Sequence, residues 1–289
     1  MIITRINIEI FMTQIINGKK IAQDILDEVK LDISKLNFKP KLAVIFVGSD
    51  KPSTTYVNKK KEAANYAGID FEIYNFPANI EKEKLVKSIK EIQKKEKNIR
   101  GMIVQLPLPE PLFTPEVLDA VSPDIDVDCL TNTNIGKLVM KTADFTPPTP
   151  QAVLEIFKSI ELNVKGKNIT IVGAGALVGK PLSIMLLNKE ATITTCNEHT
   201  KDLKKILKKS DIIVSAVGKK DLIRKNMLKK NVIIIDTGIA FANKKMYGDV
   251  NFAEAIKKAS YITPTPGGVG PITVSLLMQN LLVCSQKKV

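Results

Sequence analysis

The sequence predicts an α/β protein of two domains, and three observations lead to this prediction. The chain has 289 residues, roughly twice the size of an average domain. Short apolar stretches typical of buried strands alternate with longer amphipathic stretches typical of helices. A proline-rich segment, FTPPTP at 145–150, interrupts this alternation near its middle. Such alternation is typical of parallel sheets with helices on both faces.

The first series of elements precedes the proline-rich segment. Apolar residues at Ile21, Ile25, Val29 and Ile33 recur at helical spacing and predict a helix over 21–36. The next segment, KLAVIFVG, is apolar throughout, ends in glycine and predicts a buried strand. The strands of this series are expected at 41–48, 70–75 and 101–105, and its further helices at 53–67 and 82–97.

The second series follows the proline-rich segment and begins with the strand NITIVG. Its further elements are a helix from about 177, a strand at 191–196, a lysine-rich helix, and strands at 211–218 and 231–238. We therefore place an N-terminal domain at 1–148 and a C-terminal domain at 149–289. The final helix, within 272–289, belongs to the second domain or packs back on the first.

The net charge of +13 raises the question of a nucleic-acid partner, and the pattern of charges argues against one. The excess is almost entirely lysine, whereas nucleic-acid sites favour arginine. Lysines alternate with glutamates in segments such as 81–97, which is typical of a solvated helix face. A nucleic-acid binder would instead need a clustered basic face. We expect no nucleic-acid partner.

The composition also bears on the cellular location of the protein. No apolar run approaches the roughly 20 residues of a membrane-spanning helix, and the N-terminus lacks the pattern of a secretory signal. Met12 is a candidate for the true start, with residues 1–11 an extension or an added strand. Cys129, Cys196 and Cys284 are far apart and suggest neither a disulfide framework nor a zinc site. We expect a cytoplasmic protein without membrane association.

A glycine turn opens the second series. Gly173, Gly175 and Gly179 lie between a strand and a helix, where the pyrophosphate of a dinucleotide approaches backbone N–H groups. Glu198 follows the next strand, where a dinucleotide fold places a carboxylate against the ribose hydroxyls. The spacing is GxGxxxG rather than GxGxxG, so tight packing is an alternative role for the turn. A surface-loop acid is the alternative for Glu198.

A row of polar side chains is expected on the helix at 53–67. Ser53, Tyr56 and Lys60 are three and four residues apart and therefore share one face. A lysine that is partly removed from water can exchange protons near neutral pH. The alternative is that Lys60, like its neighbours Lys59 and Lys61, is simply solvated.

Two loops carry further polar residues. Gln105 ends a buried strand, and Asp126 and Asp128 are expected to point the same way in an extended chain. Two carboxylates suit a metal ion or a polar heterocycle, but the lack of further hard ligands makes the metal the weaker option. The glycine-rich loop at 262–273 is typical of a close backbone approach to a ligand.

Six motifs together resemble one known family. They are VGSDKPSTTYVNKKK, GMIVQLPLP, PDIDVD, the glycine turn with its VGKP end, GDVNF and ITPTPGGVGPIT. In this order, from about Gln14 to Gln279, the chain is similar to the bifunctional methylenetetrahydrofolate dehydrogenase/methenyltetrahydrofolate cyclohydrolase family of FolD type.

The resemblance implies a fold and an activity. The fold is a three-layer α/β folate-binding domain followed by a Rossmann-like dinucleotide-binding domain, with a folate cleft between them and a homodimer through the dinucleotide domains. The activity is oxidation of 5,10-methylenetetrahydrofolate by a nicotinamide cofactor, then hydrolysis to 10-formyltetrahydrofolate. A monofunctional NAD-dependent dehydrogenase is the alternative. A generic amino- or hydroxy-acid dehydrogenase would share the architecture but would not explain the site residues.

The resemblance also implies residue roles. Lys60 occupies the position of the catalytic lysine, Gln105 orients it, and Tyr56 stacks on or hydrogen-bonds to the folate. Asp128 binds the amino group and a ring nitrogen of the pterin, and Ser53 supports the site. The remaining substrate-binding positions are Pro264, Gly267 and Gly268. The cofactor-binding positions are Gly173, Ala174, Gly175, Val178, Gly179, Glu198, Thr200, Val217, Gly218, Gly238 and Ile239. No metal site is implied.

Three departures from the family pattern carry expectations of their own. Ala174 replaces the arginine that pairs with an NADP 2′-phosphate, and Glu198 replaces a serine that donates to it. Either NAD or NADP fits the fold, and the carboxylate predicts a preference for NAD. The alternative is that His199 or Lys180 contacts the phosphate. Cys129 replaces a glycine, so a positive φ there would be strained.

Overall fold

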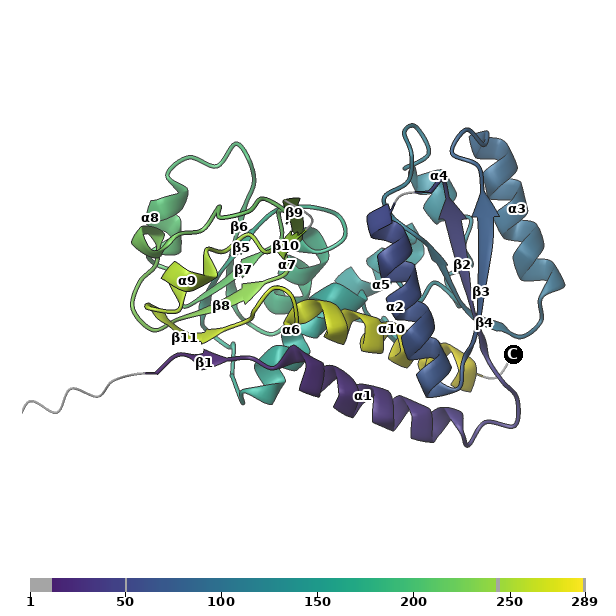
Figure 1. The fold of residues 1–289 in the computed structure, drawn as a ribbon, viewed down its shortest axis with the longest axis horizontal. Helices are drawn as coiled ribbons and strands as arrows, with labels where there is room; N and C mark the ends of the chain where they lie inside the picture. Colours follow the sequence, from purple (N-terminus) through teal and green to yellow (C-terminus); the bar gives the residue numbers. More distant parts are fainter. Residues whose placement is uncertain (1–11, 50, 243–244, 288–289) are drawn as a thin grey trace, which may run out of the picture.

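The computed structural model describes residues 12–49, 51–242 and 245–287, and within them it has the predicted α/β fold. The expectations for residues 1–11 lie outside this range. Two separate parallel sheets form, one in each half of the fold, and helices cover both (Figure 1). Every pairing within these two sheets is parallel, as the alternation of strands and helices predicts.

The N-terminal sheet has three strands, with β2 (Lys41–Val47) between β3 (Asp70–Phe76) and β4 (Ile99–Val104). Alternate side chains of β2 enter two different cores. Leu42 and Val44 pack with α1 (Gly18–Ile33) and α2 (Lys51–Ala67), whereas Ala43 and Ile45 pack with α3 (Lys82–Lys95) and α4 (Pro115–Leu118). The continuous apolar sequence of β2 is thus explained by burial of both faces, which α2 and α3 cover from opposite sides (Figure 1).

The C-terminal sheet has six strands in the order β1-β11-β8-β7-β5-β6. Its strands are β1 (Gln14–Ile15), β5 (Asn168–Val172), β6 (Thr192–Cys196), β7 (Ile212–Ser215), β8 (Val232–Asp236) and β11 (Ala259–Ile262). Its helices are α6 (Pro148–Ser159), α7 (Gly179–Leu187), α8 (Leu203–Leu207) and α9 (Phe252–Ala255). A 3-10 turn, η1 (Lys225–Met227), and an antiparallel hairpin of β9 (Ala240–Ala242) and β10 (Lys245–Tyr247) complete this part.

The start of the chain departs from a simple division at residue 148. Strand β1 pairs with β11, and the N–H of Ile16 donates to the carbonyl of Ile262 at 2.9 Å. The chain therefore contributes an edge strand to the C-terminal sheet before it enters the N-terminal one. The division at 148/149 stays a proposal.

The final helix, α10 (Val269–Gln286), packs back on the N-terminal part. It lies against α1, α2, α6 and β4. A Cβ atom at Gly101 would lie 2.8 Å from Leu281 Cδ1, so a larger residue there would require the Leu281 side chain to shift where β4 approaches α10. Helix α10 is long and apolar enough to cross a membrane, but 61% of it is buried inside the fold. Its apolar composition is explained by that burial.

One local expectation is wrong. Helix α5 (Asn132–Val139) begins within the loop that we expected at 122–136, and Thr131 caps it by accepting from the N–H of Asn134 at 3.3 Å. The expected lysine-rich helix is present as the five residues of α8, which Asp202 precedes in the left-handed conformation. The three cysteines are free and buried.

Candidate active site

Helix α2 presents the expected row of polar side chains. Ser53 is buried, and Tyr56 and Lys60 are half-buried. The Oη atom of Tyr56 is buried and has no hydrogen-bond partner among the described residues. Burial raises the pKa of this phenol, which therefore stays protonated at neutral pH. A buried, unpartnered hydroxyl on this face is a ready contact for a ligand.

Lys60 meets Gln105 at the carboxyl end of β4. The Nζ atom of Lys60 donates to Oε1 of Gln105 at 3.0 Å. The Nε2 atom of Gln105 donates to the carbonyl of Leu106 at 2.7 Å, which turns Oε1 toward the lysine. Burial lowers the pKa of Lys60, and the carboxylate of Asp128 opposes this shift. A lysine in this setting gives up a proton more easily than a solvated one.

The two aspartates have different surroundings, so the expected extended geometry is wrong. Residues 126–129 form a turn in which the N–H of Cys129 donates to the carbonyl of Asp126 at 2.9 Å. Asp126 is buried and accepts from the N–H groups of Leu130 and Thr131, at 3.2 and 2.9 Å. Asp128 is only partly buried, and its charge acts on Lys60. Asp126 holds the loop, while Asp128 belongs with the row on α2.

The strain expected at Cys129 is present. Its φ of 57° is in the left-handed region, and its side chain is fully buried. Helix α10 supports this turn through Asn280, whose Nδ2 atom donates to the carbonyls of Val127 and Thr146 at 2.8 and 2.9 Å. One buried amide therefore fixes both the loop that carries Asp128 and the chain segment before α6.

The glycine turn connects β5 to α7 as expected. Gly173 has a φ of 112°, and a Cβ atom at Gly179 would lie 1.8 Å from the Gly173 carbonyl oxygen. Both positions therefore require glycine, whereas a Cβ at Gly175 would meet nothing within 4 Å. Ala174 and Val178 complete the turn and are half-buried. Gly175 is exposed in this turn, which follows the carboxyl end of β5, the position at which dinucleotide folds in general bind a pyrophosphate.

The segment after β6 carries the predicted acid. Glu198 is exposed and lies 3.7 Å from the ring of the equally exposed His199. Thr200 closes the loop, since its Oγ1 accepts from the N–H of Asn197 at 2.9 Å. Lys180 is exposed at the start of α7.

The loops after β7 and β8 bring the other predicted cofactor residues together. Val217 and Ile239 are exposed, Gly218 has a φ of 81°, and a Cβ at Gly218 would lie 3.2 Å from the Ile239 carbonyl oxygen. Two buried aspartates that sequence reasoning missed, Asp236 and Asp249, hold these loops. Asp249 stands in the quoted motif GDVNF, but the motif gives no sign that its side chain reaches the loop after β7.

The loop before α10 is tightly packed. A Cβ atom at Gly268 would lie 2.5 Å from the carbonyl oxygen of Pro264, and Gly267 has a φ of 100°. A Cβ at Gly18 would lie 1.8 Å from the Gly268 carbonyl oxygen, so the starts of α1 and α10 touch. We expected the glycines of the loop at 262–273 to allow close approach of a ligand. Tight packing explains part of them.

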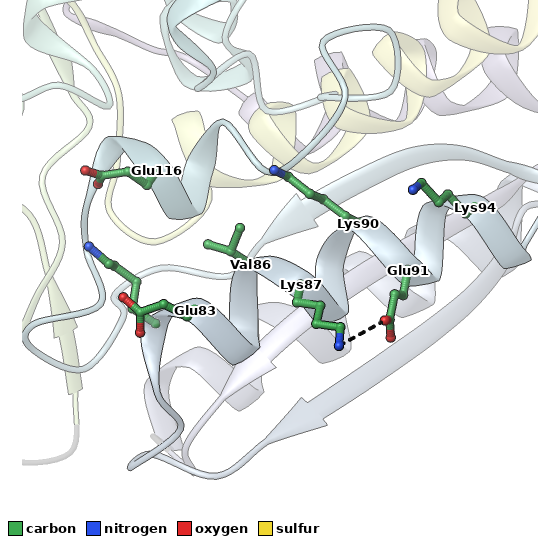
Figure 2. Close-up of a pocket in the computed structure, with 8 residues that line it drawn as sticks. Glu83, Val86, Lys87, Lys90, Glu91, Lys94 and Glu116 are labelled. Atoms are coloured by element: carbon green, nitrogen blue, oxygen red, sulfur yellow. Dashed lines mark ion pairs between the residues drawn. The ribbon is translucent and has the colours of Figure 1, made fainter.

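Two further features lie outside this arrangement. No cluster of metal-ligating side chains occurs in the described parts of the chain. An open hollow over α3 and α4 is lined by lysines and glutamates, including the pair Lys87–Glu91 at 4.0 Å (Figure 2). It lies on the layer opposite α2 and holds none of the predicted site residues.

Comparison with known families identifies this arrangement. Residues 16–128 match the description "Tetrahydrofolate dehydrogenase/cyclohydrolase, catalytic domain", and residues 147–289 match "Tetrahydrofolate dehydrogenase/cyclohydrolase, NAD(P)-binding domain". The chain belongs to the tetrahydrofolate dehydrogenase/cyclohydrolase family. The resemblance drawn from the sequence motifs is confirmed.

Members of this family align over nearly the whole chain. The bifunctional protein FolD of Aquifex aeolicus is 42% identical over 282 residues, which cover 96% of this chain and 97% of that protein. The crystal structure of the bifunctional FolD enzyme from Campylobacter jejuni has a TM-score of 0.91 at 35% identity, covering 95% and 99% of the two chains. The FolD structure from Trypanosoma brucei, complexed with NADP and an inhibitor, has a TM-score of 0.90 at 33% identity, covering 95% and 97%.

Proposed function

We propose that this member of the tetrahydrofolate dehydrogenase/cyclohydrolase family catalyses two successive reactions of one-carbon metabolism. It oxidises 5,10-methylenetetrahydrofolate to 5,10-methenyltetrahydrofolate and hydrolyses that product to 10-formyltetrahydrofolate. The observation that carries the proposal is the contact of Lys60 Nζ with Gln105 Oε1, beside Asp128 and the unpartnered hydroxyl of Tyr56. We assign the folate chemistry to residues 1–148 and the cofactor to residues 149–289.

Hydrolysis requires water to add to a positively charged carbon, with proton transfer from the water oxygen and to the ring nitrogen. When water adds to the methenyl carbon, Lys60 accepts the first proton that the water releases, and it returns a proton to the ring nitrogen as the carbon–nitrogen bond breaks. The remaining hydroxyl proton leaves to solvent as the formyl C=O bond forms. Burial lowers the pKa of Lys60 and so favours its neutral, proton-accepting form. Gln105 holds the amine through its hydrogen bond of 3.0 Å.

Folate recognition follows from the polar groups around Lys60. The carboxylate of Asp128 binds the amino group and a ring nitrogen of the pterin, which are charge-assisted contacts. Tyr56 packs on the ring or donates its free hydroxyl to it, and Ser53 supports this helix face. We assign Pro264, Gly267 and Gly268, in the loop before α10, to the same folate site.

The residues present fit a dinucleotide. The exposed backbone at Gly175 and the start of α7 suit a pyrophosphate, and the loops after β7 and β8 supply Val217, Gly218, Gly238 and Ile239. The nicotinamide supplies a hydride acceptor when it is bound. The protein's part in that step is to align the two carbons and exclude water.

We further propose that NAD is preferred over NADP. Glu198 follows β6 and faces the region where a dinucleotide fold places the adenosine ribose, so its carboxylate repels a 2′-phosphate. Ala174, in the glycine turn, offers no positive charge to offset that repulsion.

The assembly and location of the protein are also proposals. A homodimer through the dinucleotide domains is supported by β6, an edge strand with exposed Thr192, Thr194 and Thr195. A cytoplasmic location is supported by three free, buried cysteines. Sedimentation of the purified protein tests the first, since a single species at the monomer mass would contradict it.

The test of the function is the initial rate of 5,10-methylenetetrahydrofolate oxidation with NAD and with NADP at matched concentrations, followed by hydrolysis of added methenyltetrahydrofolate. We expect both reactions, with faster oxidation in NAD. Oxidation without hydrolysis would leave a monofunctional dehydrogenase, and neither reaction would contradict the proposal.

A further inference from the structure

Asp249 is a fully buried carboxylate in the C-terminal part, next to the predicted cofactor loops. It follows β10 and has no ion-pair partner among the residues that the structure describes. Its Oδ2 atom accepts from Ser215 Oγ at 2.7 Å and from the N–H of Val217 at 2.8 Å. Its Oδ1 atom accepts from the N–H of Lys219 at 2.7 Å. Burial of a charge is unfavourable, and these three neutral donors offset it.

The donors all belong to the end of β7 and the loop that follows it. The same carboxylate also lies on the loop after β8, because a Cβ atom at Gly238 would lie 2.1 Å from Asp249 Cγ. Asp249 therefore touches both loops, and neither can move without breaking a hydrogen bond or opening a buried contact.

The side chain of Asp236 fixes the backbone that carries Asp249. It ends β8, and its Oδ1 accepts from the N–H groups of Gly238 and Asp249 at 3.0 and 3.1 Å, while its Oδ2 accepts from Val250 at 2.9 Å. The loop after β8 and the segment that carries Asp249 are thus bound to one side chain. Asp249 has little freedom to shift.

The order of strands indicates which half of a cofactor these loops meet. The glycine turn follows β5, and the chain crosses to β6 on one side and to β7 and β8 on the other. In such a sheet the two halves of a dinucleotide lie on opposite sides of the crossing point. Glu198 after β6 marks the adenosine side, so the loops after β7 and β8 meet the nicotinamide half. A Cβ at Gly173 would lie 2.3 Å from the Ala216 carbonyl oxygen, so the β7 loop borders the glycine turn directly.

We propose that Asp249 is a positioning residue that holds the loops after β7 and β8 in the shape that binds the nicotinamide half of the cofactor. The inference rests on the proposed function, since it presumes that a nicotinamide dinucleotide binds here. Asp249 lies behind Val217, Gly218, Gly238 and Ile239 and acts through them.

The test is direct binding without folate, measured by titration calorimetry with NADH, NADPH and ADP. In Asp249→Asn one amide oxygen replaces two carboxylate oxygens, so at least one of the loop donors loses its acceptor. We expect the Kd of the preferred dinucleotide to rise at least tenfold, while the Kd of ADP, which lacks the nicotinamide half, changes less than twofold. Hydrolysis of methenyltetrahydrofolate needs no dinucleotide and is expected to keep its rate.

The matched control is Asp211→Asn. Asp211 precedes the opposite end of β7 and accepts from Lys229 Nζ at 2.6 Å and from the N–H of Asn168 at 2.9 Å. We expect Asp211→Asn to lower the melting temperature and to leave the Kd of the dinucleotide and the Kd of ADP unchanged. If Asp249→Asn does not fold, Ser215→Ala removes one donor to Asp249, and we expect a Kd for the dinucleotide about threefold higher than in the wild type.

Two results would overturn the inference. One is an unchanged dinucleotide Kd in a folded Asp249→Asn or in Ser215→Ala, and the other is an equal rise in the Kd of ADP, which would mean that the whole domain is disturbed. If the wild type binds neither dinucleotide, the proposed cofactor site itself is wrong. That result is distinguishable, because it appears before any substitution is made.

Discussion

The Nζ atom of Lys60 lies 3.0 Å from the Oε1 atom of Gln105, and this contact joins α2 to the residue that follows β4. The two residues are 45 positions apart in the sequence. They meet because β2 lies beside β4 and α2 crosses back over the same face of the sheet. A lysine on a helix thereby reaches the carboxyl end of a buried strand, where its charge is partly removed from water.

Replacing Gln105 with glutamate is expected to change the pH dependence of hydrolysis. A carboxylate 3 Å from Nζ favours the ammonium form, so the lowered pKa of Lys60 rises. The pH at which the rate reaches half its maximum is then expected to rise by about one unit or more. Gln93→Glu, on the opposite layer, is the control and is expected to leave the profile unchanged. Equal profiles for wild type and Gln105→Glu would contradict the role of this contact.

Asp128→Asn is expected to weaken folate binding. The loss of a charge-assisted hydrogen bond of about 1.5–3 kcal/mol corresponds to a KM for methylenetetrahydrofolate roughly 10 to 100 times higher. The KM for the dinucleotide should stay as it is. Asp124→Asn, an exposed carboxylate in the same loop, provides the control. Parallel effects of the two substitutions would show that Asp128 has no special contact with the pterin.

Glu198→Ser is expected to shift the cofactor preference toward NADP. Removal of the carboxylate ends the repulsion of a 2′-phosphate, so the ratio of kcat/KM for NADP to that for NAD should rise about tenfold or more. Glu198→Asp keeps the charge and should keep the preference for NAD. Unchanged NADP kinetics in Glu198→Ser would show that this acid does not face the phosphate.

The stability of the protein is expected to fall between about pH 4 and pH 7 through Asp236. Burial is the main cause that raises the pKa of Asp236 from 3.8 to about 7, and Asp249 adds to it. Between these values the unfolded chain is ionised and the folded one is protonated, so the stabilisation present below pH 3.8 is lost as the pH rises toward 7. In Asp236→Asn, the free energy of unfolding, measured by urea denaturation at a series of pH values, should no longer show this decline.

The control for this pH-dependent loss of stability is Asp211. Its pKa is lowered, and the largest cause is the hydrogen bond from Lys229. Its stabilisation is present above its ordinary pKa of 3.8 and is lost only as the pH falls below that value. Asp211→Asn should therefore leave the decline from pH 5 to pH 7 intact. If the free energy of unfolding of Asp236→Asn declines with pH as steeply as that of the wild type, other groups cause the decline.

The sequence predicted the elements whose signal is local. The apolar run of β2 and the glycine turn between β5 and α7 were placed correctly because both faces of β2 are buried and the turn requires glycine at Gly173 and Gly179. The row on α2 follows from helical spacing alone. Its contact with Gln105 was expected only from the resemblance, since nothing local indicates which residue of another element it meets.

What the sequence could not predict depends on distant contacts. Strand β1 has two exposed residues, so no pattern marks it, and it forms only because β11 offers a free edge. Asp126 and Asp128 look alike in a strand-like PDIDVD, yet a turn buries one and leaves the other near Lys60. Asp249 reaches across to Val217, 32 positions away, and no spacing rule connects them.

The most direct test of the central claim is Lys60→Met compared with Lys59→Met. Lys59 is the adjacent, exposed lysine and pairs with Glu62 at 2.7 Å. We predict that Lys60→Met lowers the rate of methenyltetrahydrofolate hydrolysis at least about a hundredfold, as expected for the loss of a general acid–base group, and that it still binds the dinucleotide. Lys59→Met should hydrolyse at the wild-type rate. Hydrolysis at the wild-type rate by a folded Lys60→Met would contradict the account.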